Sequence, residues 1–534
     1  MSTPNVPKKN RFVIIAKAKI RIITIALMLL IEIGLITTVI ILSSVYDIKW
    51  LNVIYFLFEL FSIVVAIPII VNSRMDSSYK ITWLAFMVVN SVIGATFYLL
   101  FANKKFSKKE MKKIRPTINA LERTMDSKES KGLTSGNLID PNSDLHTFAS
   151  YIREHSFTDT YANTTTQYFP WGEDAFPVML DRLKKAKHYI FLEYFIIQHG
   201  AFWNPIVEIL IQKAKEGVDV RVLYDDLGCL STLPVHYDEE LRKQGIKCYK
   251  YSPLKPFIDI RMNNRDHRKI MVIDGHTGFT GGINIADEYI NEIVRFGKWK
   301  DNAILLEGDG VFGLTNLFLS TWVRVSNQEK PINYADYLPS KYINETSIER
   351  KAKGFVSVYG SIPYTYETVG LNIYTMLCYK AKRYIDICTP YLILNKEMED
   401  AISQAAKSGV RVRLLTPHIP DKKMVFELTK SYYFRLIKAG VEIYEYTPGF
   451  VHAKMFCVDG KMATVGTINL DYRSLFLHCE NGCLLYETES IKDIEKDFNN
   501  TFKVSQRITR EEMENQKLSK RILRVILRVF APLM

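Results

Sequence analysis

Two eighteen-residue stretches of the chain share one pattern and decide how its central part is organised. Residues 267–284 read HRKIMVIDGHTGFTGGIN, and residues 452–469 read HAKMFCVDGKMATVGTIN. Both fit HxKx4Dx6GxxN without a gap, and the apolar run after each lysine is typical of a buried β-strand. A single HxK triplet carries little information, whereas two long copies with equal spacing indicate a duplicated unit.

The duplication extends upstream of these stretches. Residues 186–195 (AKHYIFLEYF) match residues 381–390 (AKRYIDICTP), and residues 214–223 (AKEGVDVRVL) match residues 406–415 (AKSGVRVRLL). In each half the order is a strand, a helix that ends at a glycine, and another strand, and glycine is common where a helix stops. The pattern therefore predicts two domains of alternating strands and helices.

We predict an α/β fold in which residues 166–325 and 350–505 form two tandem domains of mixed sheets flanked by helices, related by pseudo-twofold symmetry. A polar connector with a lysine-rich start, residues 104–165, precedes them. Residues 507–534 are predicted to include a basic amphipathic helix, which either lies on a bilayer or packs on the second domain.

Residues 1–103 are predicted to form a membrane anchor. Three apolar runs, at 22–46, 50–72 and 81–103, each reach the roughly 20 residues that a helix needs to cross a bilayer. Lysines and arginines cluster before the first run and after the third, and the positive-inside rule assigns both clusters to the cytoplasm. We therefore expect two true crossings, with one run interfacial or re-entrant, and a cytoplasmic body.

The formal net charge of +13 lies mainly at the two ends of the chain. Residues 1–115 carry +11 and residues 507–534 carry +4, which leaves −2 on the rest. A nucleic-acid-binding protein usually carries its positive charge on the folded body, so the distribution favours anionic lipid as a partner and argues against nucleic acid. The seven cysteines contain no CxxC pair, and we expect reduced core residues without a disulfide framework or a zinc site.

Position along a strand decides which motif residues can meet. The histidine and lysine of each copy are two positions apart and so share one face of their strand. The aspartate is seven positions from its histidine, which places it on the opposite face and suits it to supporting the strand end or the following turn. The motif candidates for the catalytic set are His267, Lys269 and Asp274 in the first copy and His452, Lys454 and Asp459 in the second.

An acidic residue follows at equivalent places in the two halves. The segment that begins at Asp301 reads DNAILL, and the segment that begins at Glu480 reads ENGCLL. A carboxylate on one imidazole nitrogen selects the tautomer of a histidine and steadies its ring. We therefore expect Asp301 and Glu480 to orient the two motif histidines.

Together the halves supply two imidazoles, two lysines and two asparagines, a set that can transfer a phosphoryl group without a metal or another cofactor. One histidine can attack phosphorus while the other protonates the departing alkoxide. The lysines, with Asn284, Asn469, Gly282 and Thr467 of the two GxxN turns, would bind or support the phosphoryl oxygens. Neither half alone supplies both the nucleophile and the acid.

These motifs resemble the HKD motif of the phospholipase D superfamily, and over about residues 50–534 the chain closely resembles bacterial cardiolipin synthases. The likeness includes residues 278–289, 299–301 and 466–474. It implies an active site between two mixed-sheet domains and a cell-membrane enzyme that joins two phosphatidylglycerols into cardiolipin and glycerol through a phosphohistidine. It also implies that His267 is the nucleophile and His452 the acid and base.

Three other functions share part of this pattern. A phospholipase D-type hydrolase, or a transphosphatidylase with another alcohol acceptor, would use the same residues, so the motifs do not discriminate between them. A DNA-cleaving relative is disfavoured by the net charge of −2 on the body and by the apolar N-terminal runs. A non-catalytic lipid-binding scaffold is disfavoured because both motif copies are intact.

Overall fold

The computed structural model describes residues 49–73, 75–91, 108–127, 138–253, 263–326, 332–342, 352–363 and 367–533, and a few more within 34–45 and 94–98. The chain divides into two compact units. The smaller comprises residues 1–105, 254–263 and 529–534, and the larger comprises residues 106–253 and 264–528.

The described part of the smaller unit includes α2 (Lys49–Val71) and α3 (Ser77–Val89), which fall in the second and third predicted apolar runs. Within the described part of the chain, only α2 has a segment, Asn52–Val71, that is long and apolar enough to cross a membrane. Helix α3 has 13 residues, fewer than the roughly 20 of a crossing helix. Most of the run at 22–46 lies outside the described residues, so two crossings stay a prediction.

The first repeat folds into a seven-stranded mixed sheet with the order β2-β8-β7-β6-β3-β4-β5. Strands β3, β4 and β5 are parallel, and the remaining pairs are antiparallel. The strands are β2 (Thr164–Phe169), β3 (Tyr189–Tyr194), β4 (Asp219–Asp225), β5 (Lys247–Tyr251), β6 (Lys269–Ile273), β7 (Thr277–Gly281) and β8 (Ala303–Gly308), and the main helices are α8 (Gly172–Lys184), α9 (Trp203–Lys215), α10 (Tyr237–Lys243) and α11 (Val311–Ser326).

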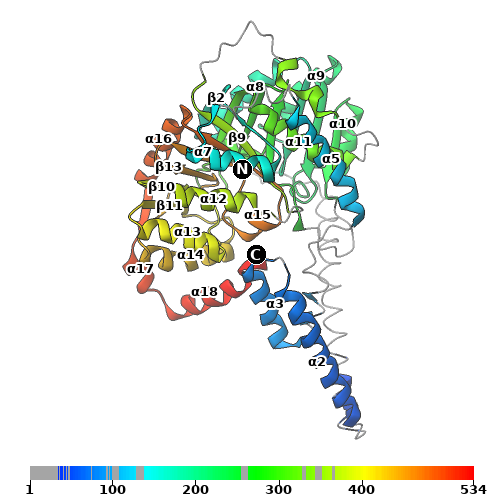
Figure 1. Cartoon of the computed structure of the whole chain (residues 1–534), viewed down its shortest axis with the longest axis vertical. Helices are drawn as coiled ribbons and strands as arrows, with labels where there is room; N and C mark the ends of the chain where they lie inside the picture. The colour runs from blue at the N-terminus through cyan, green and yellow to red at the C-terminus, as the bar shows by residue number, and fades with distance from the viewer. Residues whose placement is uncertain are drawn as a thin grey trace. The chain divides into compact units, whose positions relative to one another are not determined.

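The second repeat forms a nine-stranded sheet with the order β1-β9-β15-β14-β13-β10-β11-β12-β16. Its strands are β1 (Thr160–Tyr161), β9 (Phe355–Ser361), β10 (Tyr384–Cys388), β11 (Arg411–Pro417), β12 (Glu442–Tyr446), β13 (Met455–Val458), β14 (Met462–Gly466), β15 (Glu480–Tyr486) and β16 (Ser505–Ile508). Its helices are α12 (Val369–Lys380), α13 (Lys396–Lys407), α14 (Lys423–Lys438), α15 (Tyr472–Phe476) and α16 (Ser490–Lys503), followed by α17 (Arg510–Glu514) and α18 (Leu518–Phe530). Figure 1 shows α13 and α14 side by side along this sheet.

The two sheets confirm the predicted pairing of mixed α/β repeats. The run β2-β8-β7-β6-β3-β4-β5 corresponds strand for strand to β9-β15-β14-β13-β10-β11-β12, and β1 and β16 extend the second sheet at its edges. One cluster of buried apolar side chains contains members of both repeats, including Ile304 and Leu306 from β8 and Val356 and Val358 from β9. The repeats therefore share a core and fold as one body, with motif strands β6 and β13 in the interior of their sheets.

In its described residues, the predicted polar connector, 104–165, includes helices α5 (Lys108–Asp126) and α7 (Asp144–Ser156), which belong to this body. Helix α5 packs against α11, and α7 packs against α12 and β9. A few apolar residues at helical spacing make this possible, because Leu145, Phe148 and Ile152 form one buried face of α7. All seven cysteines are buried, as the sequence predicted.

Candidate active site

Backbone hydrogen bonds between the repeats bring the two motif histidines to one interface. The His267 N–H donates to the carbonyl of Cys479 at 2.9 Å, and the His452 N–H donates to the carbonyl of Lys300 at 2.7 Å. In each case a residue just before the motif strand of one half pairs with a residue just before the acidic residue of the other half. The reciprocal pairing follows from the pseudo-twofold arrangement, and it places both imidazoles between the two sheets.

Each imidazole is bound by a carboxylate from the opposite half. The distance from His267 Nδ1 to Glu480 Oε1 is 2.9 Å, and that from His452 Nδ1 to Asp301 Oδ2 is 2.6 Å. The sequence pointed to these two acids but not to the exchange of partners between halves. With Nδ1–H donating to a carboxylate, Nε2 of each ring carries the lone pair, which is the form that a nucleophile or a general base requires.

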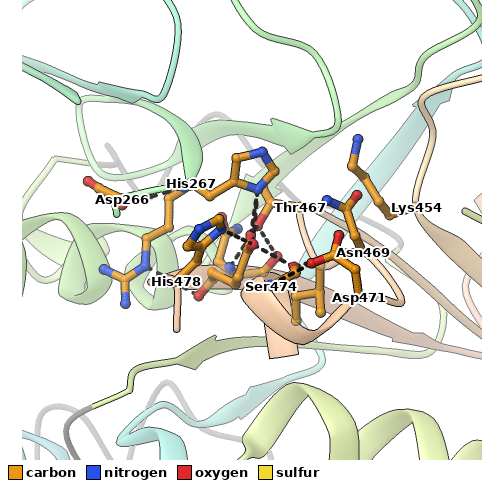
Figure 2. Close-up of polar contacts among 12 residues, drawn as sticks. Asp266, His267, Lys454, Thr467, Asn469, Asp471, Ser474 and His478 are labelled. Carbon is orange, nitrogen blue, oxygen red and sulfur yellow. Dashed lines mark hydrogen bonds and ion pairs between the residues drawn. The ribbon is translucent and has the colours of Figure 1, made fainter. Parts of the chain in front are cut away.

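The buried carboxylate of Glu480 accepts several hydrogen bonds. Figure 2 labels its partners His267, Thr467 and Ser474, which lie close together. Besides His267, the Ser474 hydroxyl donates to it at 2.6 Å, and the Thr467 hydroxyl also donates to it. His478 Nδ1 lies 3.7 Å from Oε1. Burial by itself raises the pKa of Glu480, but the charge of His267, its hydrogen bond to the carboxylate and the nearby His478 ring hold this pKa well below its usual range. The carboxylate therefore stays ionised.

Asp301 occupies the equivalent place beside His452. Burial raises its pKa, yet the charges of Lys454 and His452 outweigh burial and keep the pKa below the usual value. Gly282 makes room for this carboxylate, since a Cβ at position 282 would lie 2.0 Å from Asp301 Oδ1. At the matching position of the other half, Thr467 instead donates its hydroxyl to the longer side chain of Glu480. Gly282 and Thr467 thus support the two acids.

The motif lysines are fully buried beside the histidines. Lys269 Nζ donates to the carbonyl of His267 at 2.7 Å, and Lys454 Nζ lies 2.8 Å from His452 Nδ1. Burial and the nearby charge of Lys454 lower the pKa of Lys269 to about 7, and burial lowers the pKa of Lys454 to about 8. Two ammonium groups that are costly to keep charged are well placed to receive an anion, whose charge would stabilise their protonated forms.

Both histidines are neutral at neutral pH. Burial is the largest cause, and it lowers the pKa of His267 to about 3 and the pKa of His452 to about 4. The lysine charges add to this effect, and the carboxylates oppose it. The arrangement can therefore present an unprotonated Nε2 to an electrophile, and an anion bound between the rings would favour protonation of one of them.

The two predicted asparagines differ in their contacts. Asn284 Oδ1 accepts from the Ile196 N–H at 3.0 Å, and its Nδ2 donates to the Tyr289 hydroxyl at 2.8 Å, so this side chain supports the loop around it. Asn469 Oδ1 is buried, and no described residue donates a hydrogen bond to it. Of the two, Asn469 thus keeps a polar atom uncommitted beside Lys454 and the Glu480 network (Figure 2).

The motif aspartates hold the backbone. The Asp274 carboxylate accepts from the N–H groups of residues 187, 188 and 189 at 2.8, 2.7 and 2.8 Å, where β3 begins. Asp459 accepts in the same way from residues 382, 383 and 384, at the start of β10. These contacts agree with the strand-parity argument, in which each aspartate supports a strand and lies away from its own histidine.

Two residues in the network were missed by the sequence reasoning. These are Ser474, which donates a hydrogen bond to Glu480, and His478, which lies beside it. The spacing offered a signal, since His478 stands two positions before Glu480 and an extended backbone points both to one side. Ligand atoms of His267, His478 and Glu480 lie within 4.8 Å of one another, close enough to hold a metal ion, so the expectation of a metal-free site stays a prediction.

Comparison with known proteins identifies the family. A family model described as "Cardiolipin synthase, PLD-like domain" matches residues 179–294 and 376–502, one segment in each repeat. The chain is 33% identical to a cardiolipin synthase of Geobacillus kaustophilus over 88% of its own length and 92% of the relative. It is 43% identical to an uncharacterized protein of Streptococcus mutans over 87% of its length and 98% of that protein.

A solved structure supports the fold. The crystal structure of phosphatidylserine synthase from Haemophilus influenzae superposes with a TM-score of 0.51 at 15% identity, over 69% of this chain and 93% of that one. The two paired repeats are therefore an architecture shared with a distant phospholipid enzyme. The alignment with the Geobacillus cardiolipin synthase covers most of both chains, and the family model matches both repeats. The chain therefore belongs to the cardiolipin synthase family of phospholipase D-like proteins.

Proposed function

We propose that the protein is a phosphatidyltransferase that joins two phosphatidylglycerol molecules into cardiolipin and glycerol through a phosphohistidine intermediate. The observation that carries the proposal is the reciprocal pairing of His267 with Glu480 and of His452 with Asp301 across the two halves. Such an arrangement supplies one nucleophile and one acid in a single buried site, and the names of the relatives specify the lipid.

In the first step, Nε2 of His267 attacks the phosphorus of the donor lipid. The new N–P bond forms as the bond from phosphorus to the glycerol oxygen breaks, and protonated His452 gives its Nε2 proton to that oxygen, so glycerol leaves neutral. Glu480 stabilises the positive charge that develops on the attacking imidazole, because it stays ionised at 2.9 Å from Nδ1.

In the second step, a hydroxyl of the second phosphatidylglycerol attacks the phosphohistidine. His452 is now unprotonated, and it accepts the hydroxyl proton as the new O–P bond forms and the N–P bond breaks. Cardiolipin is released, and His452 carries the proton that the next turnover needs. The nucleophile and the acid return to their starting states, so the cycle consumes no cofactor.

The substrate itself supplies the protonation state that the first step requires. In the free site the pKa of His452 is about 4, so the ring is mostly neutral at pH 7. The negative phosphodiester raises this pKa on binding, and ionised Asp301 stabilises the resulting imidazolium. Lys269, Lys454 and Asn469 are assigned to the non-bridging oxygens, where charge builds up in the transition state.

The test uses the purified full chain in mixed micelles with phosphatidylglycerol. Cardiolipin and glycerol in equal amounts are expected, and phosphatidic acid as the main product would overturn transfer in favour of hydrolysis. His267→Ala and His452→Ala should each abolish turnover. His236→Ala is a matched control, because His236 also pairs with a carboxylate, Glu239, but at an exposed site. Phosphate trapped on His267, detected by mass spectrometry, would identify the nucleophile.

We also infer that the N-terminal segment anchors the enzyme in the bacterial cell membrane, with anionic lipid and not nucleic acid as its partner. Helix α2 supports the anchor by its length and exposed apolar surface, and the positive charge near both ends of the anchor supports a cytoplasmic body. Labelling of a single surface cysteine in intact cells with a membrane-impermeant reagent tests the side. Labelling without lysis would contradict a cytoplasmic body.

A further inference from the structure

The C-terminal helix α18 has its polar and apolar faces reversed. A surface helix usually packs its apolar face inward and leaves its charges in water. In α18 the buried residues are Arg524 and Leu527, and four apolar side chains are each at least 51% exposed. These exposed side chains are Leu518, Ile522, Val525 and Ile526.

The arginine face is fixed to the second repeat. Arg524 Nε donates to Glu427 of α14 at 2.9 Å, and Arg528 Nη2 donates to Glu399 of α13 at 3.0 Å. The Arg528 guanidinium also lies 4.3 Å from the centre of the Tyr432 ring. Charge-assisted hydrogen bonds to partly buried carboxylates are strong, so rotating the apolar face inward would break both pairs.

The exposed apolar side chains form a continuous stripe. Ile522, Val525, Ile526 and Val529 follow the spacing i, i+3, i+4 and i+7 of one helix face, opposite Arg524. With 13 residues the helix is about 20 Å long, which is too short to cross the hydrocarbon core of a bilayer. A stripe of this length suits a helix that lies parallel to a surface.

The end of α18 belongs to the same compact unit as α2 and α3. The Thr82 hydroxyl of α3 donates to the Val529 carbonyl at 2.9 Å, and the Phe86 and Phe530 rings meet edge to face at 5.8 Å. Since α2 of that unit is long and apolar enough to cross a membrane, the last residues of α18, Val529 and Phe530, belong to a unit that contains a candidate membrane span.

We propose that α18 lies in the boundary between headgroups and acyl chains of the bilayer, with its apolar stripe in lipid and its arginine face on Glu399 and Glu427. The basic face thus binds protein, the opposite of the orientation expected for a basic helix on a membrane. The inference concerns the docking of the body and does not rest on the proposed reaction.

The experiment measures lipid contact directly. Because the native cysteines are buried, single cysteines at Ile522 and Val525 can be labelled with the fluorophore NBD. Met424→Cys, on α14 and half-exposed, is the matched control. The full chain is reconstituted in vesicles of phosphatidylethanolamine and phosphatidylglycerol, with or without doxyl-labelled lipid. Doxyl lipid should quench the signals at 522 and 525 at least twofold and leave the signal at 424 unchanged.

Absence of doxyl quenching at both positions would overturn the proposal. Quenching by iodide added to the water, measured in parallel, reports exposure to solvent. If neither quencher acts, a second copy or another segment of the chain covers the stripe, and the proposal is likewise overturned. A second set of variants tests the arginine face. Arg524→Glu should reduce quenching at 522, and Glu427→Arg in the same chain should restore it. Arg510→Glu, at an exposed ion pair, is the control and should have no effect. Full quenching in Arg524→Glu would refute the role of the ion pairs.

Discussion

Replacing Glu480 by glutamine tests the exchange of partners between the halves. The change keeps the shape of the side chain and removes its charge. The hydroxyls of Ser474 and Thr467, which now donate to the carboxylate, can rotate to accept from the amide, so the fold should tolerate the substitution. What is lost is the negative charge 2.9 Å from His267 Nδ1.

The expected effect follows from the charge that develops on the attacking ring. A full charge about 4 Å from a carboxylate is stabilised by about 4 kcal/mol at an effective dielectric constant of about 20. Only part of that charge is present in the transition state, so Glu480→Gln should cost about 2–4 kcal/mol, roughly a 30- to 1000-fold slower attack.

The assay compares phosphatidylglycerol with a phosphatidyl p-nitrophenol ester, whose leaving group needs no proton. Asp301→Asn impairs the acid His452, so its defect in the first step, measured as the initial burst of nitrophenol, should largely disappear with the nitrophenyl ester. Glu480→Gln impairs the nucleophile His267, and its defect should remain with both substrates. Glu445→Gln is the matched control, because Glu445 is a buried partner of His418, at 2.9 Å, outside the site. It should change the rate less than threefold.

Two results would refute this reasoning. If Glu480→Gln kept the rate within threefold of wild type, its carboxylate would not stabilise the developing charge. If the nitrophenyl ester rescued Glu480→Gln and not Asp301→Asn, the roles of the two histidines would be reversed, with His452 as the nucleophile.

Three further predictions concern charge, space and support in the site. As pH rises through 7 and 8, Lys269 and Lys454 lose protons in the free enzyme. The value of kcat/KM for the anionic lipid should therefore fall on the alkaline side of a pH–rate profile. A flat profile to pH 9 would contradict the role of the two lysines. Gly282→Ala should lower kcat at least about tenfold, since its Cβ displaces the Asp301 carboxylate, and unchanged kinetics would exclude that clash. Asp274→Ala removes a carboxylate that accepts hydrogen bonds from three backbone N–H groups, and it should lower the free energy of unfolding by about 3 kcal/mol or more in urea titrations. A loss below about 1 kcal/mol would contradict a structural role.

The spacing of residues along the sequence was enough to predict the repeats and which motif residues share a strand face. Equal spacing in two copies identified the repeat, the i, i+2 relation paired each histidine with its lysine, and seven-residue parity separated Asp274 and Asp459 from their histidines. These inferences worked because side-chain direction along an extended chain is set by backbone geometry alone. Helices α5 and α7 were less visible, since their few buried apolar residues lie among many charged ones.

The sequence by itself determined which residues are candidates for the chemistry: two histidines, two lysines and the acids Asp301 and Glu480. Only the tertiary structure decided their partners, because sequence spacing measures separation along the chain and says nothing about which half packs against which. The reciprocal backbone pairs at Cys479 and Lys300 place each acid beside the other half's histidine. The same holds for α18, whose pattern showed two faces and whose ion pairs to Glu399 and Glu427 decided which of them meets the protein.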